Sequence, residues 1–288
     1  MENRNDLLFN IQKIFPKLSK GQKRIAQFII DHYDKAAFMT ASKLGGQTNV
    51  SESTVVRFAN SLGFEGYPQL QRSLQDIIKT KLTTVQRVEM GKDYSNDMDV
   101  VERIMKSDLD NVRSTIESID YETIEKVIDA IMGADKIYII GLRSSKSLAD
   151  FLGFYLSLIL GNVSMVGYGI SDIYEQMLHI SEKDLLISLS FPRYSSRTIE
   201  VTKYAKEQGA KVVAITDSVI SPIAGIADYY LTAKSSMASF VDSLVAPLSL
   251  INAVIVAIGM REKKDITEYF NKLENIWEKY NIYDGSVR

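Results

Sequence analysis

Two short segments of the chain concentrate hydroxyl groups at points where a helix is expected to begin. Ser144 and Ser145 directly follow an apolar run, and a second apolar run precedes a segment that holds Arg193, Ser195, Ser196, Arg197 and Thr198. A helix N-terminus offers backbone N–H groups and a positive dipole end, which favour an anion. Serine and arginine side chains add donors that suit a phosphate. The two turns therefore predict a phosphate site, with helix capping by serine as the alternative for either turn alone.

A third segment has the spacing of a helix-turn-helix. Residues 41–48 predict a short helix, Asn49 and Val50 predict a turn, and Ser51 caps a helix that runs to about Leu62. At 100° per residue the polar side chains of this second helix lie opposite its apolar face. Arginine suits guanine and asparagine suits adenine in the major groove, so the candidate DNA contacts are Lys43, Ser51, Ser53, Thr54, Arg57 and Asn60. A small helical bundle with a solvated polar face is the alternative.

One further pair has side chains suited to acid–base catalysis. Glu175 and His179 are four residues apart in a segment that predicts a helix before the third apolar run. A carboxylate and an imidazole are the groups with which an enzyme moves protons between a sugar aldehyde and ketone. Because most pairs at this spacing are solvated surface groups, the pair is not assigned a catalytic role.

The candidate DNA contacts lie in a basic, helical part of the chain. Residues 1–80 hold 11 Lys and Arg against 7 Asp and Glu, a net charge of +4, whereas the whole 288-residue chain carries −2. From Asp6 to about Leu82 apolar residues recur at helical spacing, with Ser19 as an N-cap and Gly63 as a stop. The sequence therefore predicts an all-α head, whose charge is typical of a DNA-binding domain.

The two hydroxyl-rich turns lie in a part of the chain with a different periodicity. Short apolar runs alternate there with helical segments, at residues 136–141, 162–166, 184–190, 211–216 and 228–231. Near-continuous apolar runs between helices indicate a parallel sheet covered on both faces. The predicted body is an α/β doubly wound parallel sheet, in which ligands bind beyond the carboxyl ends of the strands.

Composition excludes several classes of site. The chain has no cysteine, so disulfides, thiolate metal sites and cysteine nucleophiles are all ruled out. Its two histidines, His32 and His179, are far apart in sequence, and we expect neither a metal nor a cofactor. No segment has the length and apolarity of a membrane span, and the first residues lack a secretion signal. We therefore expect a cytoplasmic protein.

The head resembles a known family. Residues 18–74, and above all SESTVVRFANSLGFEGY at residues 51–67, are similar to the N-terminal domain of RpiR-type transcriptional regulators. The resemblance implies that this domain binds DNA. Where the family usually has an alanine, this chain has Gly45, and the pair Gly45 and Gly46 is expected to loosen the first helix of the motif by roughly 1 kcal/mol per glycine.

The body resembles a SIS domain, the sugar isomerase fold that binds phosphosugars. The resemblance covers about Tyr121 to Met260 and rests on IYIIGLRSSKSLA, on the long segment DLLISLSFPRYSSRTIEVTKYAKEQGAKVVAITDSVISPIAGIADYYL, and on SFVDSLVAP. It implies phosphate contacts from Ser144, Ser145, Ser190, Ser195 and Thr198. The second phosphate turn is usually closer to SxSGxT, whereas this chain reads SFPRYSSRT, which changes its shape and charge.

These observations predict a transcriptional regulator of carbohydrate metabolism that is not an enzyme and senses a phosphorylated sugar or a related carbohydrate derivative. Its expected partners are double-stranded operator DNA, the sugar effector and further copies of itself, as a homodimer or homotetramer. The predicted divisions are a DNA-binding domain (1–82), a linker and connecting helix (83–120), a SIS-like domain (121–260) and a C-terminal helix (261–288). A phosphosugar isomerase with an accessory helical domain is the alternative, and a head that mediates only protein contacts is a third possibility.

Overall fold

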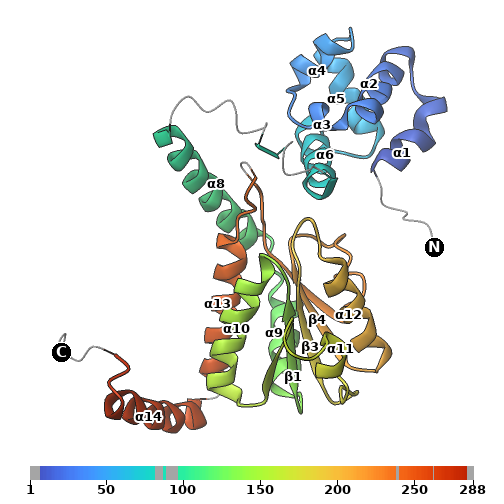
Figure 1. Cartoon of the computed structure of the whole chain (residues 1–288). Coiled ribbons are helices and arrows are strands. Elements are labelled where there is room, and N and C mark those ends of the chain that lie inside the picture. The colour runs from blue at the N-terminus through green and yellow to red at the C-terminus, as the bar shows by residue number, and fades with distance from the viewer. Residues whose placement is uncertain (1–6, 82–86, 89–96, 238–239, 262, 284–288) are drawn as a thin grey trace. The chain divides into compact units, whose positions relative to one another are not determined.

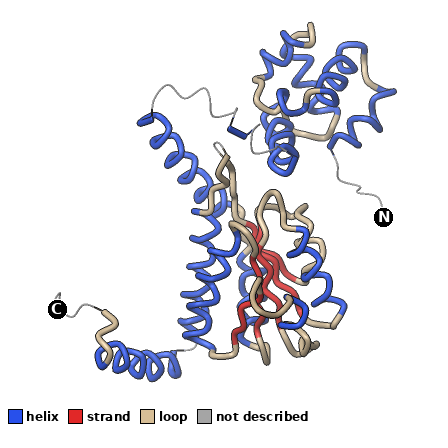
Figure 2. Tube along the Cα trace, viewed as in Figure 1, coloured by secondary structure: helices blue, strands red, loops and turns tan. Residues whose placement is uncertain are grey.

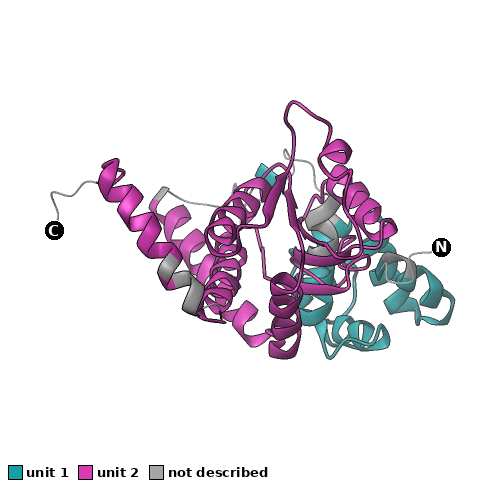
Figure 3. Ribbon diagram, turned by 90° about the horizontal axis from the view of Figure 1, so that it is seen from below, with its two compact units in different colours: residues 1–93 teal, residues 94–288 magenta. Residues whose placement is uncertain are grey.

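A computed structural model of the chain describes residues 7–81, 87–88, 97–237, 240–261 and 263–283 (Figures 1 and 2). The chain divides into two compact units, Met1–Asp93 and Tyr94–Arg288 (Figure 3). Most of the predicted linker, Thr83 to Asp99, lies outside the described residues. The predicted division at residues 82 and 120 therefore stays a prediction.

Unit 1 is helical wherever its secondary structure is described. Its elements are α1 (Leu7–Ile14), a 3-10 turn (Phe15–Lys17), α2 (Lys20–Asp31), α3 (Tyr33–Ala36), α4 (Ala41–Gln47), α5 (Glu52–Ser61) and α6 (Tyr67–Lys81). Ser19 starts α2 with a capping box, in which its hydroxyl accepts from the Gln22 N–H while the Gln22 side chain accepts from the Ser19 N–H. Gly63 follows α5 with a φ of 89°, a left-handed conformation that glycine adopts without strain.

The helices of unit 1 share an apolar core, and Tyr67 ties α6 to the chain that follows α3. The Tyr67 hydroxyl donates to the carbonyl of Met39 at 2.7 Å. The ring is buried, and burial raises the pKa of the Tyr67 hydroxyl to about 12. The neutral phenol is therefore held as a hydrogen-bond donor that links segments far apart in sequence.

Unit 2 alternates helices and parallel strands. It contains α8 (Asp97–Glu117), α9 (Tyr121–Met132), β1 (Ile137–Gly141), α10 (Ser145–Leu160), β2 (Val163–Val166), α11 (Ile173–Gln176), β3 (Leu185–Leu189), α12 (Ser196–Glu207), β4 (Lys211–Thr216), β5 (Tyr229–Thr232), α13 (Val245–Arg261) and α14 (Lys263–Lys279). The strand order is β2-β1-β3-β4-β5, and every pairing is parallel. This confirms the predicted doubly wound body and puts the switch point between β1 and β3.

Alternate residues of the strands pack into two separate apolar cores, because successive side chains of a strand point to opposite faces of the sheet. Ile137 and Ile139 of β1 pack with α9, α10 and α13, whereas Tyr138 and Ile140 pack with α11 and α12. Figure 1 shows α10 and α13 on one side of the sheet and α12 on the other. The helices on both faces leave the carboxyl ends of the strands as the edge at which loops gather.

Two elements differ from their predicted extents. The apolar segment 240–260 predicts a helix over its whole length, but the helix begins only at Val245. The residues before it make other contacts, with the Ser235 hydroxyl donating to the Ser243 carbonyl and Met237 bridging to Asp242. Helix α11 is a single turn. No helix in the described ranges has the length and apolarity needed to cross a membrane.

Candidate functional site

Helix α5 has the two faces that the helical spacing predicts. Val55, Phe58 and Ala59 are buried against the other helices of unit 1. The opposite face is open, since Ser53, Arg57 and Asn60 are exposed. Of the remaining candidate DNA contacts, Ser51 and Lys43 are exposed and Thr54 is half-buried.

The first turn of α5 carries a small network of hydroxyls. The Ser51 hydroxyl lies 2.9 Å from the hydroxyls of both Ser53 and Thr54, and it does not cap the helix in the usual way. The Arg57 guanidinium folds back onto this turn, where its Nε donates to the Ser53 carbonyl at 3.3 Å. A base that accepts from Arg57 in the major groove therefore competes only with weak, solvent-exposed contacts.

The turn between α4 and α5 depends on Gly45. Gly45 is buried, and a Cβ added to it would lie 2.9 Å from the carbonyl oxygen of Val50. Asn49 makes the turn with a φ of 53°. Gly45 was expected only to loosen α4. The structure gives it a second role, because the absence of a side chain lets the two helices approach closely.

The two hydroxyl-rich turns leave neighbouring strands at the same level of the sheet. Gly141, the last residue of β1, pairs with Leu189, the last residue of β3. Paired strands lie about 4.8 Å apart, so the turns that begin at Leu142 and Ser190 stand side by side at the switch point. This end of the sheet, at the switch point, is where an open parallel sheet binds its ligands.

The first turn presents exposed polar groups next to the start of α10. Arg143 is exposed with a φ of 56°, and Ser144 is exposed and makes no side-chain cap, whereas Ser145 is buried. A Cβ on Gly141 would lie 2.5 Å from the Ser145 carbonyl oxygen. Glycine at this position therefore lets the first turn of α10 pack directly on the end of β1.

The second turn is closely tied to the sheet. The Ser190 carbonyl accepts from the buried Thr216 hydroxyl at 2.7 Å, and Phe191 and Pro192 are buried. The Tyr194 hydroxyl donates to Asp217 at 2.8 Å, just beyond the end of β4. Arg193 is exposed at the tip of the turn with a φ of 65°.

The hydroxyls at the start of α12 differ in what they bind. Ser195 is the N-cap, and its hydroxyl accepts from the Thr198 N–H at 3.3 Å. Ser196 is exposed. Thr198 is fully buried, and its hydroxyl has no hydrogen-bond partner among the described residues. A buried hydroxyl without a partner is unfavourable in the folded protein, so the Thr198 hydroxyl is the group at this edge that a bound acceptor would satisfy.

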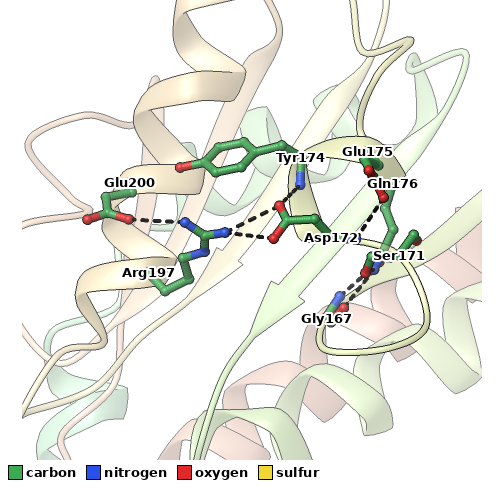
Figure 4. Close-up of polar contacts among 8 residues, drawn as sticks. All are labelled: Gly167, Ser171, Asp172, Tyr174, Glu175, Gln176, Arg197 and Glu200. Atoms are coloured by element: carbon green, nitrogen blue, oxygen red, sulfur yellow. Dashed lines mark hydrogen bonds and ion pairs between the residues drawn. The ribbon is translucent and has the colours of Figure 1, made fainter.

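Arg197, the second arginine of this turn, is engaged by other protein groups (Figure 4). Its guanidinium pairs with Asp172 at 3.0 Å and with Glu200 at 3.6 Å, and it lies over the ring of Tyr174 with 4.6 Å to the centroid. Asp172 also caps α11. Arg197 thus joins the first turns of α11 and α12, and this pairing leaves it less suited to an anion.

Glu175 and His179 do not lie on one helix. Helix α11 ends at Gln176, so His179 lies beyond it and the two residues do not share a helix face. The Glu175 carboxylate accepts from the Asp172 N–H at 2.9 Å as part of a capping box. The pair therefore has the geometry of a helix start, without the shared face that acid–base catalysis needs.

Sequence reasoning missed three participants at this edge. Arg143, Tyr194 and Asp172 belong to loops, and periodicity says nothing about where loop side chains point. The sequence held one signal that could have identified them, which is their position in the predicted parallel sheet. Each of them lies either shortly after an apolar run or just before the start of a helix. Within the described ranges, no three His, Asp or Glu side chains gather in a way that would hold a metal ion.

Family models match both parts of the chain. A helix-turn-helix domain of the rpiR family matches residues 5–81, and a SIS domain matches residues 130–257. An uncharacterized HTH-type transcriptional regulator of Haemophilus influenzae is 27% identical over 233 residues, which are 80% of this chain and 81% of the relative. The HTH-type transcriptional regulator HexR of Pseudomonas aeruginosa is 22% identical over 93% of this chain and 94% of its own.

Solved structures show the same architecture. The sugar isomerase domain of an RpiR transcription factor from Sphaerobacter thermophilus superimposes with a TM-score of 0.58 and 27% identity, over 60% of this chain and 97% of that one. The Vibrio vulnificus NanR protein complexed with ManNAc-6P matches over 96% of this chain and 99% of its own, with a TM-score of 0.57 and 19% identity. The structural match to NanR thus covers nearly the whole length of this chain.

Proposed function

We propose a function for this chain, which belongs to the RpiR family of helix-turn-helix transcriptional regulators and carries a SIS domain at residues 130–257. It binds operator DNA through α5. This binding changes when a phosphorylated sugar or a related carbohydrate derivative occupies unit 2. It regulates carbohydrate metabolism without catalysing a reaction. Its operator is double-stranded DNA, and its place of action is the cytoplasm.

The DNA-binding surface we assign is the exposed face of α5 with the adjacent start of α4. Arg57 and Asn60 read base edges, while Lys43 and the Ser51, Ser53 and Thr54 hydroxyls contact the backbone or bases. One such helix covers too few base pairs for selectivity in a genome, so the proposal includes a homodimer or homotetramer whose heads bind half-sites about 34 Å apart.

The effector site we assign lies at the two turns that follow β1 and β3. The observation that carries it is the Thr198 hydroxyl, buried at the start of α12 without a partner. A phosphate oxygen supplies the missing acceptor, and the remaining contacts we assign come from Ser144, Ser145, Ser190, Arg193, Ser195 and Ser196. The neighbouring fold in NanR holds ManNAc-6P, which supports an acylamino-sugar phosphate among the probes.

A regulator needs its ligand to bind two states with different affinity. Because Thr198 is fully covered, a ligand reaches its hydroxyl only after neighbouring groups shift. We assign that shift to the 190–195 turn, which directly precedes α12 and which the Tyr194–Asp217 hydrogen bond ties to the end of β4. The proposal therefore contains the two states that a response requires, one with the turn closed and one with it open.

The alternative function is a phosphosugar isomerase. The observation that disfavours it is that the Glu175 carboxylate is engaged in the capping box of α11 and does not share a helix with His179, since an isomerase needs a base near the bound sugar. Turnover assays on hexose and amino-sugar phosphates distinguish the two functions, because the regulator has no turnover to lose.

The experiment compares two threonine variants of the full-length protein. Thr198→Val removes the unpaired hydroxyl, so the free energy of unfolding should stay unchanged or rise. DNA selected by the wild-type protein from a random pool should still bind with wild-type affinity. N-acetylmannosamine 6-phosphate, glucose 6-phosphate and fructose 6-phosphate serve as effector probes in anisotropy titrations, and the shift that a probe produces in the wild type should disappear in Thr198→Val.

Thr202→Val is the matched control on the same helix. The Thr202 hydroxyl is also buried but is fully engaged, with the Ser188 hydroxyl and the Thr198 carbonyl each at 2.7 Å. Its loss should lower the free energy of unfolding by about 1–3 kcal/mol and leave the effector shift intact. An equal shift in wild type and Thr198→Val would put the sensor site elsewhere, and a wild type that selects no DNA would overturn the proposal as a whole.

A further inference from the structure

Arg143 differs from the other arginines of unit 2 that the structure describes. Its side chain is exposed in the turn that follows β1, and its guanidinium has no hydrogen bond or ion pair with another described residue. The other described arginines of unit 2 all interact with neighbouring groups, as Arg197 does with Asp172 and Glu200. The positive charge of Arg143 is therefore available at the edge of the sheet that carries the proposed effector site.

The backbone of Arg143 has a conformation that a residue with a side chain rarely adopts. Its φ of 56° lies in the left-handed region, which glycine enters without strain. Among the described residues other than glycine, a positive φ occurs at two asparagines, a residue type that tolerates it, and at two arginines, Arg143 and Arg193. Backbone strain of this kind is concentrated at binding sites. Both arginines lie in the two turns to which the effector site is assigned.

Arg143 and Thr198 lie on different sides of the switch point. Arg143 directly precedes α10, which packs in the apolar core on one face of the sheet, and Thr198 lies in the first turn of α12, which packs on the other face. Figure 1 shows α10 and α12 on opposite sides of the strands. Thr198 is also fully buried, whereas Arg143 is exposed. A phosphate that reaches the Thr198 hydroxyl therefore does not account for Arg143.

We infer that the effector carries a second anionic group, a carboxylate or another phosphate, which Arg143 binds while the first phosphate is bound at Thr198. The inference rests on the proposed function, because it concerns the other end of the same ligand. A guanidinium presents a planar fork of N–H donors that fits the paired oxygens of either group. The ligand class is then a sugar phosphate with a negative charge at the end of the carbon chain remote from the phosphate.

The chemistry of this edge favours an anion over a neutral sugar end at Arg143. Two carboxylates of neighbouring loops are already engaged, since Asp172 accepts from Arg197 and Asp217 accepts from Tyr194. A hydrogen bond from a guanidinium to an anion is roughly twice as strong as one between neutral groups. A sugar hydroxyl at Arg143 would only replace a water molecule, whereas a carboxylate or phosphate would also pair with the charge.

The test compares ligands that differ only in the second charge. 6-Phosphogluconate and glucitol 6-phosphate are open chains with the same phosphate, and they differ only at the first carbon, which is a carboxylate in one and an alcohol in the other. Fructose 1,6-bisphosphate and fructose 6-phosphate are the pair for a second phosphate. Isothermal titration calorimetry of the full-length protein without DNA measures each dissociation constant. The wild type should bind at least one doubly anionic probe about tenfold or more tightly than its matched monophosphate.

Three variants examine the source of this preference. Arg143→Gly removes the guanidinium and suits the left-handed backbone, so the thermal unfolding midpoint should stay the same or rise, while the preference should disappear. Arg143→Lys keeps the charge without the planar fork and should keep part of the preference. Lys146→Gln is the matched control, because it removes the same charge from the adjacent first turn of α10 but from a side chain already paired with Asp150 at 2.6 Å. It should keep the full preference.

The inference is wrong if the wild type binds both members of each pair equally, or if it binds none of the four probes. An unchanged preference in Arg143→Gly would overturn it, and so would an equal loss in Arg143→Gly and Lys146→Gln, which would indicate general attraction to a positive turn. Thr198→Val distinguishes this inference from the proposed function, because it should weaken both members of a pair by the same factor. If the wild type binds both members of each pair equally and Thr198→Val weakens both, the proposed site stands without the second anion.

Discussion

At the scale of single residues, hydroxyl groups with the same chemistry have different partners in this protein. Ser195 is bound to its own helix as an N-cap, whereas Thr198, three residues later, is buried with an unpaired hydroxyl. The two arginines differ in exposure, because Arg197 is half-buried and pairs with Asp172 and Glu200, while Arg193 is exposed at the tip of its turn. The partner of each group, more than its type, decides which of them is available to a ligand.

Arg57 is the residue for which base recognition is most directly testable. Arg57→Ala should lower affinity for the selected DNA by about 1–3 kcal/mol, or roughly 5- to 150-fold, if the guanidinium reads a base edge. The side chain is exposed, so the thermal unfolding midpoint should not change. A mobility-shift titration at fixed salt measures the affinity, and random-sequence DNA of equal length is the control. Equal losses on both DNAs would reassign Arg57 to the phosphate backbone.

At the scale of elements, the crossing of α4 and α5 is set by the close approach of Gly45 to the chain of the next helix. Gly46, its neighbour in α4, is exposed and has open space where a Cβ would go. The two glycines therefore have opposite roles in one short helix. Gly45 allows the helices to pack, while Gly46 only weakens the helix through its conformational freedom.

Alanine at these two positions should change stability in opposite directions. Gly45→Ala forces its Cβ against the Val50 carbonyl oxygen, so unit 1 should lose about 1–3 kcal/mol of unfolding free energy. Gly46→Ala should gain about 0.5–1 kcal/mol, because alanine favours the helix and restricts the unfolded chain. Calorimetry of the full chain measures both, and a shift of the same sign in both variants would contradict the packing role of Gly45.

At the scale of the whole molecule, charge is divided between the two functions. Residues 1–80 carry +4 and the remainder −6. DNA binding depends on releasing counterions from the phosphates that basic side chains neutralise, and the basic part of the chain is the one that carries the helix-turn-helix. The acidic remainder holds the sheet and the proposed effector site.

DNA binding should therefore fall steeply with salt although the chain as a whole is acidic. We expect a linear fall of log affinity with log salt between about 50 and 200 mM. Lys43→Gln, at an exposed position of α4, should reduce that slope by about one for each bound head, whereas Lys203→Gln, at an exposed position of α12, should not. Fluorescence anisotropy at several salt concentrations measures the slope. Equal slopes for wild type and Lys43→Gln would remove Lys43 from the phosphate contacts.

The sequence by itself determined the elements and their order. The apolar face of α5, the cap at Ser19 and the stop at Gly63 follow from patterns a few residues long, and so do the five parallel strands. These features depend on the spacing of apolar residues and on the local preferences of the backbone, and a few neighbouring residues are enough to determine both. The sequence also predicted that the two hydroxyl-rich turns lie at one edge of the sheet, because the carboxyl ends of parallel strands share that edge. The strand order that makes β1 and β3 neighbours came from the tertiary structure.

Only the tertiary structure decided which groups meet. The pairing of Arg197 with Asp172 joins residues 25 apart, and the unpaired Thr198 hydroxyl depends on what covers it. The exposure of apolar side chains on α8, such as Met105 and Leu109, depends on which face of that helix its own unit uses. Periodicity identifies an apolar face but does not say whether this chain or another one covers it. Polar partners and helix neighbours come from distant parts of the chain, so they exist only once the fold has brought those parts together.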